Sequence, residues 1–317
     1  MVNRVTVAAV SAFAQPWDEQ VKPADVVDRM ITHWGERLET VIHQRPDLLV
    51  LPEYCDRPYV ATYPRDLLEE YYAIRGDRIR DFFAEKAAEF GINIAYSASR
   101  DTPAGRFNST QFLGRDGAVV GVYDKCFITD GERSVMGVTP GAGARTVQLD
   151  FGSVAGTICF DLNFEELLVD VARLRPDLVV FSSAFHGGYL QSHWAYTARA
   201  HFVGAIYPPS KSAVLNPFGE VISTSTNYRH ETIAEINLDS ALIHIDFNGV
   251  KFNAIRREYG RDVRIHDPGS IGAVMISSER DGLSIDEVID RFELVRLDDY
   301  FTRVRTFRAD ASRAGTV

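Results

Sequence analysis

The same order of signals occurs twice in this chain, and it constrains the fold more than any other feature. An Arg-Pro-Asp tripeptide at residues 45–47 follows a segment with helical spacing of apolar residues, and another at residues 175–177 follows a second such segment. Each tripeptide leads into a continuous apolar run, Leu48–Leu51 and Leu178–Phe181. Such a run is typical of a strand that is covered on both faces. The repeat therefore predicts two helix–strand halves within one α/β domain.

The segments around this repeat also alternate between strand and helix patterns. Apolar runs rich in β-branched residues predict further strands over residues 5–10, 92–96 and 154–158. Turn residues at 114–117 and 216–219 predict two hairpins. Helical spacing of apolar residues predicts helices over residues 24–43, 78–90, 164–174 and 192–203.

The pattern loosens after about Ser240, and we expect a domain over residues 1–275 followed by a C-terminal arm over 276–317. Ser284-Ile285-Asp286-Glu287 matches a helix capping box, and a helical stripe of apolar residues follows it. This last helix could pack on the core or reach a second subunit.

Composition excludes several classes of protein. The chain has 317 residues, 44 acidic against 34 basic side chains and three cysteines. Three cysteines cannot form a disulfide framework, and a reducing compartment, the cytoplasm, is the simpler expectation. The net charge of −10 argues against a nucleic-acid or anionic-membrane partner. Ala12-Phe13-Ala14 loosely resembles the cleavage site of a signal peptide, but the apolar stretch before it is short and is better explained as a strand.

Cys159 is the strongest candidate for a nucleophile. It directly follows the predicted strand 154–158 and precedes a predicted helix. A residue at such a turn is presented at the carboxyl edge of the sheet, where α/β proteins place their sites. A nearby helix N-terminus favours the thiolate form. The alternative is an inert, buried cysteine, which is the more probable role of Cys55 and Cys126.

A thiol nucleophile needs a base, and Glu53 is a better candidate than any histidine. Glu53 follows the apolar strand 48–51, which would leave its carboxylate partly desolvated. Lys125 likewise follows a predicted strand and could offer a fixed positive charge to an oxyanion. Either residue could instead be an ordinary surface side chain. The spacing of the histidines at 186, 193 and 201 matches no metal-binding motif, so no metal is expected.

Taken in order, these motifs resemble the nitrilase superfamily, the carbon–nitrogen hydrolases. The resemblance is carried by Leu-Val-Leu-Pro-Glu at 49–53, Tyr-Asp-Lys-Cys-Phe at 123–127 and Gly-Thr-Ile-Cys-Phe-Asp-Leu at 156–162. Further agreement lies at Gly131-Glu132, at Trp194 and at Pro217-Phe218-Gly219. The resemblance spans residues 3–240, and the amidase and carbamoylase branches fit best.

The resemblance implies a four-layer α-β-β-α sandwich and a homodimer or higher homo-oligomer. It also implies that Cys159 attacks a small amide or N-carbamoyl compound while Glu53 moves protons. Lys125 and the backbone N–H of Phe160 would stabilise the oxyanion, with no metal or organic cofactor. Residues expected to bind the substrate or orient groups around it are Glu132, Phe160, Asn163, Phe185 and Tyr59.

Two alternatives to amide hydrolysis stay open at this point. The family's nitrilases tend to carry Cys-Trp-Glu, whereas Cys159-Phe160-Asp161 stands here, which disfavours nitrile hydrolysis. The chain also departs from the family's usual Arg-Phe-Pro-Glu with Asn-Phe-Glu-Glu at 163–166. The second alternative is a member that keeps the fold, binds a partner and does not catalyse.

Overall fold

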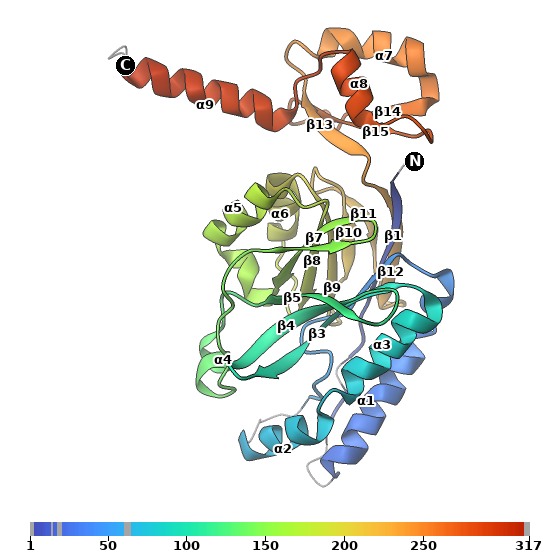
Figure 1. Ribbon diagram of the computed structural model, residues 1–317, viewed down its shortest axis with the longest axis vertical. Helices are drawn as coiled ribbons and strands as arrows, with labels where there is room; N and C mark the ends of the chain where they lie inside the picture. Colours follow the sequence, from blue (N-terminus) through green and yellow to red (C-terminus); the bar gives the residue numbers. More distant parts are fainter. Residues whose placement is uncertain (1–2, 14, 18–20, 60–64, 314–317) are drawn as a thin grey trace. The chain divides into compact units, whose positions relative to one another are not determined.

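The computed structural model divides the chain into two compact units. The larger unit is Val5–Ile236, and the smaller one combines Met1–Arg4 with Asn237–Val317. The structure describes residues 3–13, 15–17, 21–59 and 65–313, and Ala14 of the signal-like motif lies outside them. Figure 1 shows the elements of each unit.

The larger unit contains two six-stranded sheets, which confirms the predicted α/β class. The first sheet has the order β12-β1-β2-β3-β4-β5, with β12 Glu231–Asn237, β1 Arg4–Val10, β2 Leu48–Val50, β3 Asn93–Thr102, β4 Gly105–Leu113 and β5 Val119–Asp124. The second has the order β6-β7-β8-β9-β10-β11, with β6 Thr146–Leu149, β7 Gly152–Ile158, β8 Leu178–Ser183, β9 His201–Ile206, β10 Ala213–Leu215 and β11 Val221–Thr224.

The two sheets repeat one arrangement of strands. In each sheet two parallel pairs occupy the middle, β1–β2 and β2–β3 in the first and β7–β8 and β8–β9 in the second. Two antiparallel strands follow on one side, β4 and β5 in the first sheet and β10 and β11 in the second. The sixth strand lies at the opposite edge, β12 beside β1 and β6 beside β7. The internal duplication predicted from the Arg-Pro-Asp segments therefore extends over both sheets.

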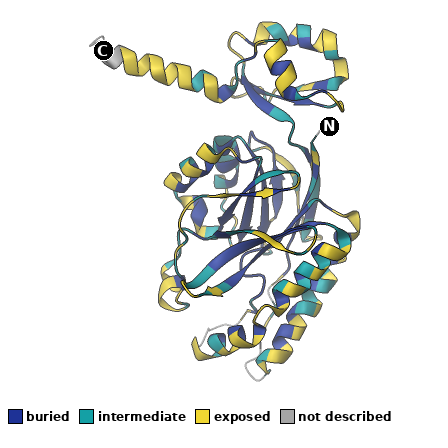
Figure 2. Ribbon diagram, in the orientation of Figure 1, coloured by how far each residue is buried: buried dark blue, intermediate teal, exposed yellow. Residues whose placement is uncertain are grey.

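Helices cover the outer face of each sheet, giving four layers. The helices α1 Pro23–Leu38, α2 Arg65–Arg75 and α3 Arg78–Phe90 share a buried apolar core with the first sheet. The helices α5 Glu165–Leu174 and α6 Leu190–Ala198 share another with the second sheet. The inner faces of the sheets meet, and Ser182 of β8 donates a hydrogen bond of 2.8 Å to the carbonyl of Leu51. Figure 2 shows the resulting buried interior.

The Arg-Pro-Asp segments perform the same task in both halves. Arg45 and Arg175 adopt left-handed backbone conformations, with φ of 49° and 51°, which end the preceding helical turn. The Asp47 carboxylate accepts the backbone N–H of Thr6 on β1, and the Asp177 carboxylate accepts that of Ser153 on β7, at 2.8 and 2.7 Å. Each aspartate thus joins its strand to the neighbouring one, which explains why the tripeptide recurs.

Two predicted helices are too long. The helix predicted over 24–43 ends at Leu38, and a short 3-10 turn, η1 Ile42–Gln44, follows it. The helix predicted over 192–203 ends at Ala198, because Arg199 adopts the left-handed conformation and His201 begins β9. Phe202 and Val203 are apolar and buried, and periodicity alone cannot assign so short a run to helix or strand.

The smaller unit has its own sheet and core. Its antiparallel sheet has the order β13-β15-β14, with β13 Ser240–His244, β15 Ala273–Ser278 and β14 Val263–His266. Its helices are α7 Phe252–Tyr259, α8 Ile285–Arg291 and α9 Leu297–Arg313, with 3-10 turns η3 Gly249–Lys251 and η4 Gly260–Asp262. The predicted capping box is present at Ser284 and Glu287. The expected domain boundary near residue 275 stays a prediction.

Among the described residues, none of the helices combines the length and the apolar character that crossing a bilayer requires.

Candidate active site

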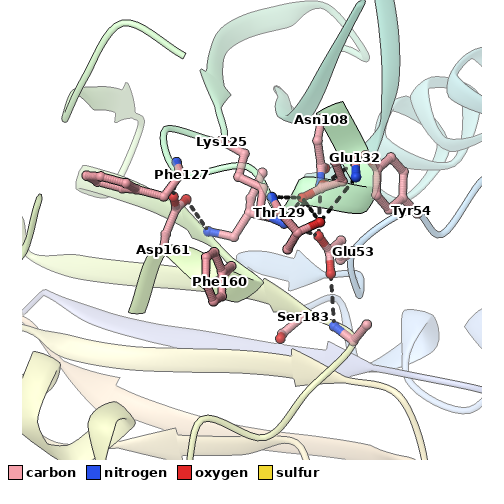
Figure 3. Close-up of polar contacts among 12 residues, drawn as sticks. Glu53, Tyr54, Asn108, Lys125, Phe127, Thr129, Glu132, Phe160, Asp161 and Ser183 are labelled. Carbon is pink, nitrogen blue, oxygen red and sulfur yellow. Dashed lines mark hydrogen bonds and ion pairs between the residues drawn. The ribbon is translucent and has the colours of Figure 1, made fainter. Parts of the chain in front are cut away.

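The three residues predicted to be catalytic follow the carboxyl ends of strands in the two facing sheets. Glu53 comes shortly after β2, Lys125 directly after β5 and Cys159 directly after β7. The backbone N–H of Ala184, which directly follows β8, donates to Glu53 Oε2 at 3.2 Å. These strand ends bring the side chains together at one end of the sandwich, as Figure 3 shows for Glu53 and Lys125.

A buried ammonium joins two buried carboxylates at the centre of the site. Lys125 Nζ lies 2.9 Å from Glu53 Oε1, and 3.0 and 2.9 Å from the two oxygens of Glu132. The three side chains are at most 7% exposed. Burial alone would lower the pKa of Lys125, but the negative charges around it raise that pKa, so the ammonium stays charged. The three groups together carry a net charge of −1.

Glu132 is fixed by the helix that it begins. Thr129 caps the short helix α4 Asp130–Ser134, and Glu132 completes the capping box by accepting the Thr129 backbone N–H at 2.8 Å. The Tyr54 hydroxyl also donates to Glu132 Oε1 at 3.0 Å. Burial would raise the pKa of Glu132, but Lys125 and these hydrogen bonds outweigh it and hold that pKa below its usual range. Glu132 therefore remains an anion behind Lys125.

Cys159 is held in a strained turn beside this cluster. Its φ of 48° lies in the left-handed region, which non-glycine residues seldom adopt and which recurs at functional sites. Burial raises the pKa of its thiol, and so do the charge of Glu53 and a hydrogen bond with it, while Lys125 acts in the opposite direction. A 3-10 turn, η2 Cys159–Asn163, begins at the cysteine, and α5 begins at Glu165. Burial opposes the thiolate that the sequence analysis expected a helix N-terminus to favour.

A buried aspartate fastens the turn that carries the thiol. The Asp161 carboxylate accepts the backbone N–H groups of Ile158 and Phe127 at 3.0 and 2.8 Å and the hydroxyl of Tyr123 at 2.8 Å. It thereby links the Cys159 turn to the segment that follows Lys125. Burial raises the pKa of Asp161 to about 6 despite these three donors.

Asp161 should make stability depend on pH. Its folded pKa of about 6 lies above the ~3.9 of an unfolded aspartate. Its stabilisation is therefore present below about pH 4 and is lost as the pH rises through 6. The side chain of Asp161→Asn does not titrate, so its stability relative to wild type should improve by about 2 kcal/mol from pH 4 to pH 7. Urea unfolding of both proteins at the two pH values measures this; a pH-independent difference would contradict it.

A cavity of about 250 Å³ adjoins Glu53. Tyr54, Tyr207 and Ala184 form part of its lining, and Arg57 and Tyr59 lie along it as well. The guanidinium of Arg57 lies over the Tyr54 ring, 4.1 Å from its centroid. The cavity therefore has room for a small molecule beside the cluster.

The residues predicted to bind the substrate occupy different surroundings. Tyr59 lines the cavity, and Glu132 lies behind Lys125. The Phe160 ring contacts Phe164 edge-on, and the exposed Asn163 donates to the Phe160 carbonyl at 2.9 Å. Phe185 packs against the core of the second sheet. A role in substrate binding stays a prediction for all five residues.

Sequence reasoning missed one residue of the central cluster, Asn108. It lies within β4, where Asn-Ser-Thr-Gln at 108–111 forms a polar run that is entirely buried. The available signal was a polar run between two phenylalanines, Phe107 and Phe112, within a predicted strand. The side chains that Asn108 contacts come from distant parts of the chain, so no local motif revealed them.

No group of three or more histidine, cysteine, aspartate or glutamate side chains suited to a metal ion occurs in the described part of the chain.

Comparison with known proteins identifies the family. The family model for carbon-nitrogen hydrolases matches residues 8–248. The chain is 24% identical over 219 residues to the omega-amidase NIT2 of Danio rerio, covering 62% of this chain and 78% of that protein. It is 25% identical over 235 residues to the chloroplastic omega-amidase of Arabidopsis thaliana, covering 66% and 63%.

Solved structures share the fold. Nit3 of Saccharomyces cerevisiae, from branch 10 of the nitrilase superfamily, superposes with a TM-score of 0.60 at 18% identity, covering 81% of this chain and 94% of Nit3. A variant of an amidase from Nesterenkonia sp. AN1, with a covalent acetamide adduct at its active-site cysteine, superposes with a TM-score of 0.59 at 19% identity, covering 80% and 96%. The family model covers most of the chain, and the protein therefore belongs to the carbon-nitrogen hydrolase family.

Proposed function

We propose that the protein hydrolyses the C–N bond of a small linear amide or N-carbamoyl compound through a thioester on Cys159. The observation that carries the proposal is the pairing of a buried Glu53–Lys125 ion pair with an adjacent thiol. These groups are a base, a fixed cation and a nucleophile, which are the parts that acyl transfer needs.

In the first half of the reaction the Cys159 sulfur adds to the carbonyl carbon while Glu53 takes the thiol proton. Because the pKa of the thiol is raised, a base is needed at the moment of attack. The Lys125 ammonium and the Phe160 N–H stabilise the oxyanion that forms. The C–N bond then breaks, and Glu53 returns its proton to the leaving ammonia or amine.

In the second half Glu53 takes a proton from water, whose oxygen attacks the thioester carbon. The C–S bond breaks, the acid leaves, and the proton held by Glu53 returns to the sulfur. Lys125 stays protonated in both halves, because two carboxylates surround it. No external oxidant, reductant or metal takes part in this scheme.

The cavity supports a small substrate. Its volume of about 250 Å³ lies below the 300–1,000 Å³ of typical ligand pockets. Arg57 lines it, and a guanidinium binds a carboxylate through two parallel hydrogen bonds, so a carboxylate on the substrate would find a partner there. The names of the relatives, omega-amidases, favour an amide over a nitrile. Nitrile hydrolysis remains the alternative reaction.

A substrate screen tests the proposal. The purified protein would be incubated with amides, N-carbamoyl amino acids and nitriles, with release of ammonia as the readout and intact-protein mass spectrometry for the acyl adduct. We expect ammonia from at least one amide or carbamoyl compound and an adduct on Cys159. Turnover of nitriles alone would favour a nitrilase, and no ammonia or adduct across the panel would favour a non-catalytic, partner-binding member.

We also propose a cytoplasmic location and a homo-oligomeric assembly. The location is supported by the three cysteines, which are all free in the structure. The assembly rests on the family resemblance. Light scattering on the purified protein would measure it, and a monomer at micromolar concentration would contradict it.

A further inference from the structure

The amide group of Asn108 joins the two carboxylates of the cluster. Its Nδ2 donates to Glu53 Oε1 and to Glu132 Oε1, each at 2.8 Å. The same two oxygens accept hydrogen bonds from Lys125 Nζ at 2.9 and 3.0 Å. The four side chains therefore form a closed ring in which each donor serves both carboxylates (Figure 3).

The ring counteracts the repulsion between the two buried carboxylates. Two buried carboxylates that share one ammonium repel each other, and each could turn away about its own χ angles. An Asn amide nitrogen carries two hydrogens, so it can hold both carboxylates without adding charge. With Asn108 present, the oxygen of Glu53 that faces Lys125 is fixed from two sides.

The backbone of Asn108 holds it rigidly. It lies inside β4 opposite Ser99 of β3, and its carbonyl accepts the backbone N–H of Lys125 at 2.8 Å. The residue is 0% exposed. The same residue thus fixes the start of the Lys125 segment and the carboxylates that its ammonium contacts.

The amide is held in this orientation at a cost. Its Oδ1 is buried without a hydrogen-bond partner in the described structure. An unsatisfied buried acceptor costs about 1–3 kcal/mol. Turning the amide over would place that oxygen against two carboxylates, so both N–H groups must face the cluster.

We infer that Asn108 is a positioning residue that holds Glu53 in line with Cys159 and keeps Glu132 on Lys125. The inference rests on the proposed function for its catalytic consequence. Asn108 has no exposed surface, so it acts through Glu53 and makes no contact with substrate.

Two variants and a matched control test this. Asn108→Leu removes both N–H donors, and Asn108→Asp places a third carboxylate in the ring. Asn93→Leu is the control, because Asn93 is also buried and its Nδ2 also donates twice, to the Asp47 carbonyl at 2.9 Å and to Asp150 Oδ1 at 2.8 Å. All three changes should lower stability, and only those at Asn108 should affect the chemistry.

We expect both Asn108 variants to lower kcat by about 10²-fold with KM within about twofold of wild type. The acid limb of the pH profile of kcat should move to higher pH by about one unit. In Asn108→Leu the carboxylates lose a hydrogen-bond donor, and in Asn108→Asp they gain a neighbour of like charge. The pH dependence of Cys159 alkylation by iodoacetamide should move the same way and needs no substrate. Asn93→Leu should leave both profiles unchanged.

The outcomes separate the inference from the proposed function. Unchanged alkylation and rate profiles in folded Asn108→Asp would overturn the positioning role, even if Asn108→Leu does not fold. Rate and alkylation profiles that shift equally in Asn93→Leu would also overturn the positioning role of Asn108. In a third outcome, the pH dependence of Cys159 alkylation moves to higher pH in the Asn108 variants, but wild type turns over no amide. That outcome would retain the inference and overturn the proposed hydrolysis.

Discussion

Replacing Cys159 by alanine should abolish amide turnover, lowering kcat by at least about 10⁴-fold. No other described group could replace the thiol as nucleophile. Glu53 is the nearest candidate, but Lys125 and Asn108 hold its carboxylate in place through hydrogen bonds. Stability should change by less than about 1 kcal/mol, because the removed sulfur is only partly buried and alanine keeps the turn. Ammonia release and unfolding by urea measure the two effects.

Cys126→Ala is the matched control for this variant. Cys126 directly follows Lys125 and is also only partly buried, so it tests whether any thiol near the site suffices. Its sulfur lies 3.4 Å from the oxygen of the Tyr123 hydroxyl, a contact that supports packing. We expect Cys126→Ala to keep turnover and to keep the acyl adduct. Turnover that survives in Cys159→Ala and disappears in Cys126→Ala would reverse the assignment of the nucleophile.

The two halves of the fold were predictable because their signals are local. The α3 helix occupies 78–90 as expected, since its apolar spacing is regular and Gly91 ends it in the left-handed conformation. The strands β2 and β8 were evident as uninterrupted apolar runs between breakers. The repeated strand order of the sheets could not be predicted, because it depends on pairing between segments that the sequence places far apart.

The C-terminal region was harder to predict for a physical reason. The β13 and β15 strands are almost continuously buried, so their burial patterns lack the alternation that would mark a strand with one exposed face. The capping box at Ser284 was found because its side-chain and backbone bonds lie within four residues. Hydrogen bonds between residues close in sequence can be predicted from the sequence, whereas the pairing of strands in a small three-stranded sheet cannot.

The candidate site was predictable to the extent that its members end strands. Glu53, Lys125 and Cys159 each stand where an apolar run stops, which is where a sheet presents side chains to a pocket. Asn108 lies in the middle of a strand, and its function depends on which strand pairs beside it. The hydrogen bond from the Phe127 N–H to Asp161 likewise depends on tertiary structure, because one residue follows β5 of the first sheet and the other follows β7 of the second.

Removing the ammonium of Lys125 should have the largest effect on the folded state. Lys125→Met preserves much of the volume but leaves Glu53 and Glu132 buried without their cation. Breaking a buried ion pair from one side costs about 3–5 kcal/mol. The pKa of Glu132 should then rise above its unfolded value, so the variant should be most stable at low pH and lose stability as the pH increases through neutrality. Urea unfolding between pH 5 and 8 measures this slope.

The double variant Lys125→Met with Glu132→Gln separates structure from catalysis. It removes one positive and one negative charge, so the cluster keeps the net charge of −1 that it has in wild type. We expect it to recover most of the stability that Lys125→Met loses and to flatten the dependence on pH. Turnover should stay at least about 10³-fold below wild type, because the cation that faces the oxyanion is still missing. A double variant that regains wild-type turnover would show that Lys125 serves only to balance charge, and the oxyanion role would have to pass to backbone N–H groups such as that of Phe160.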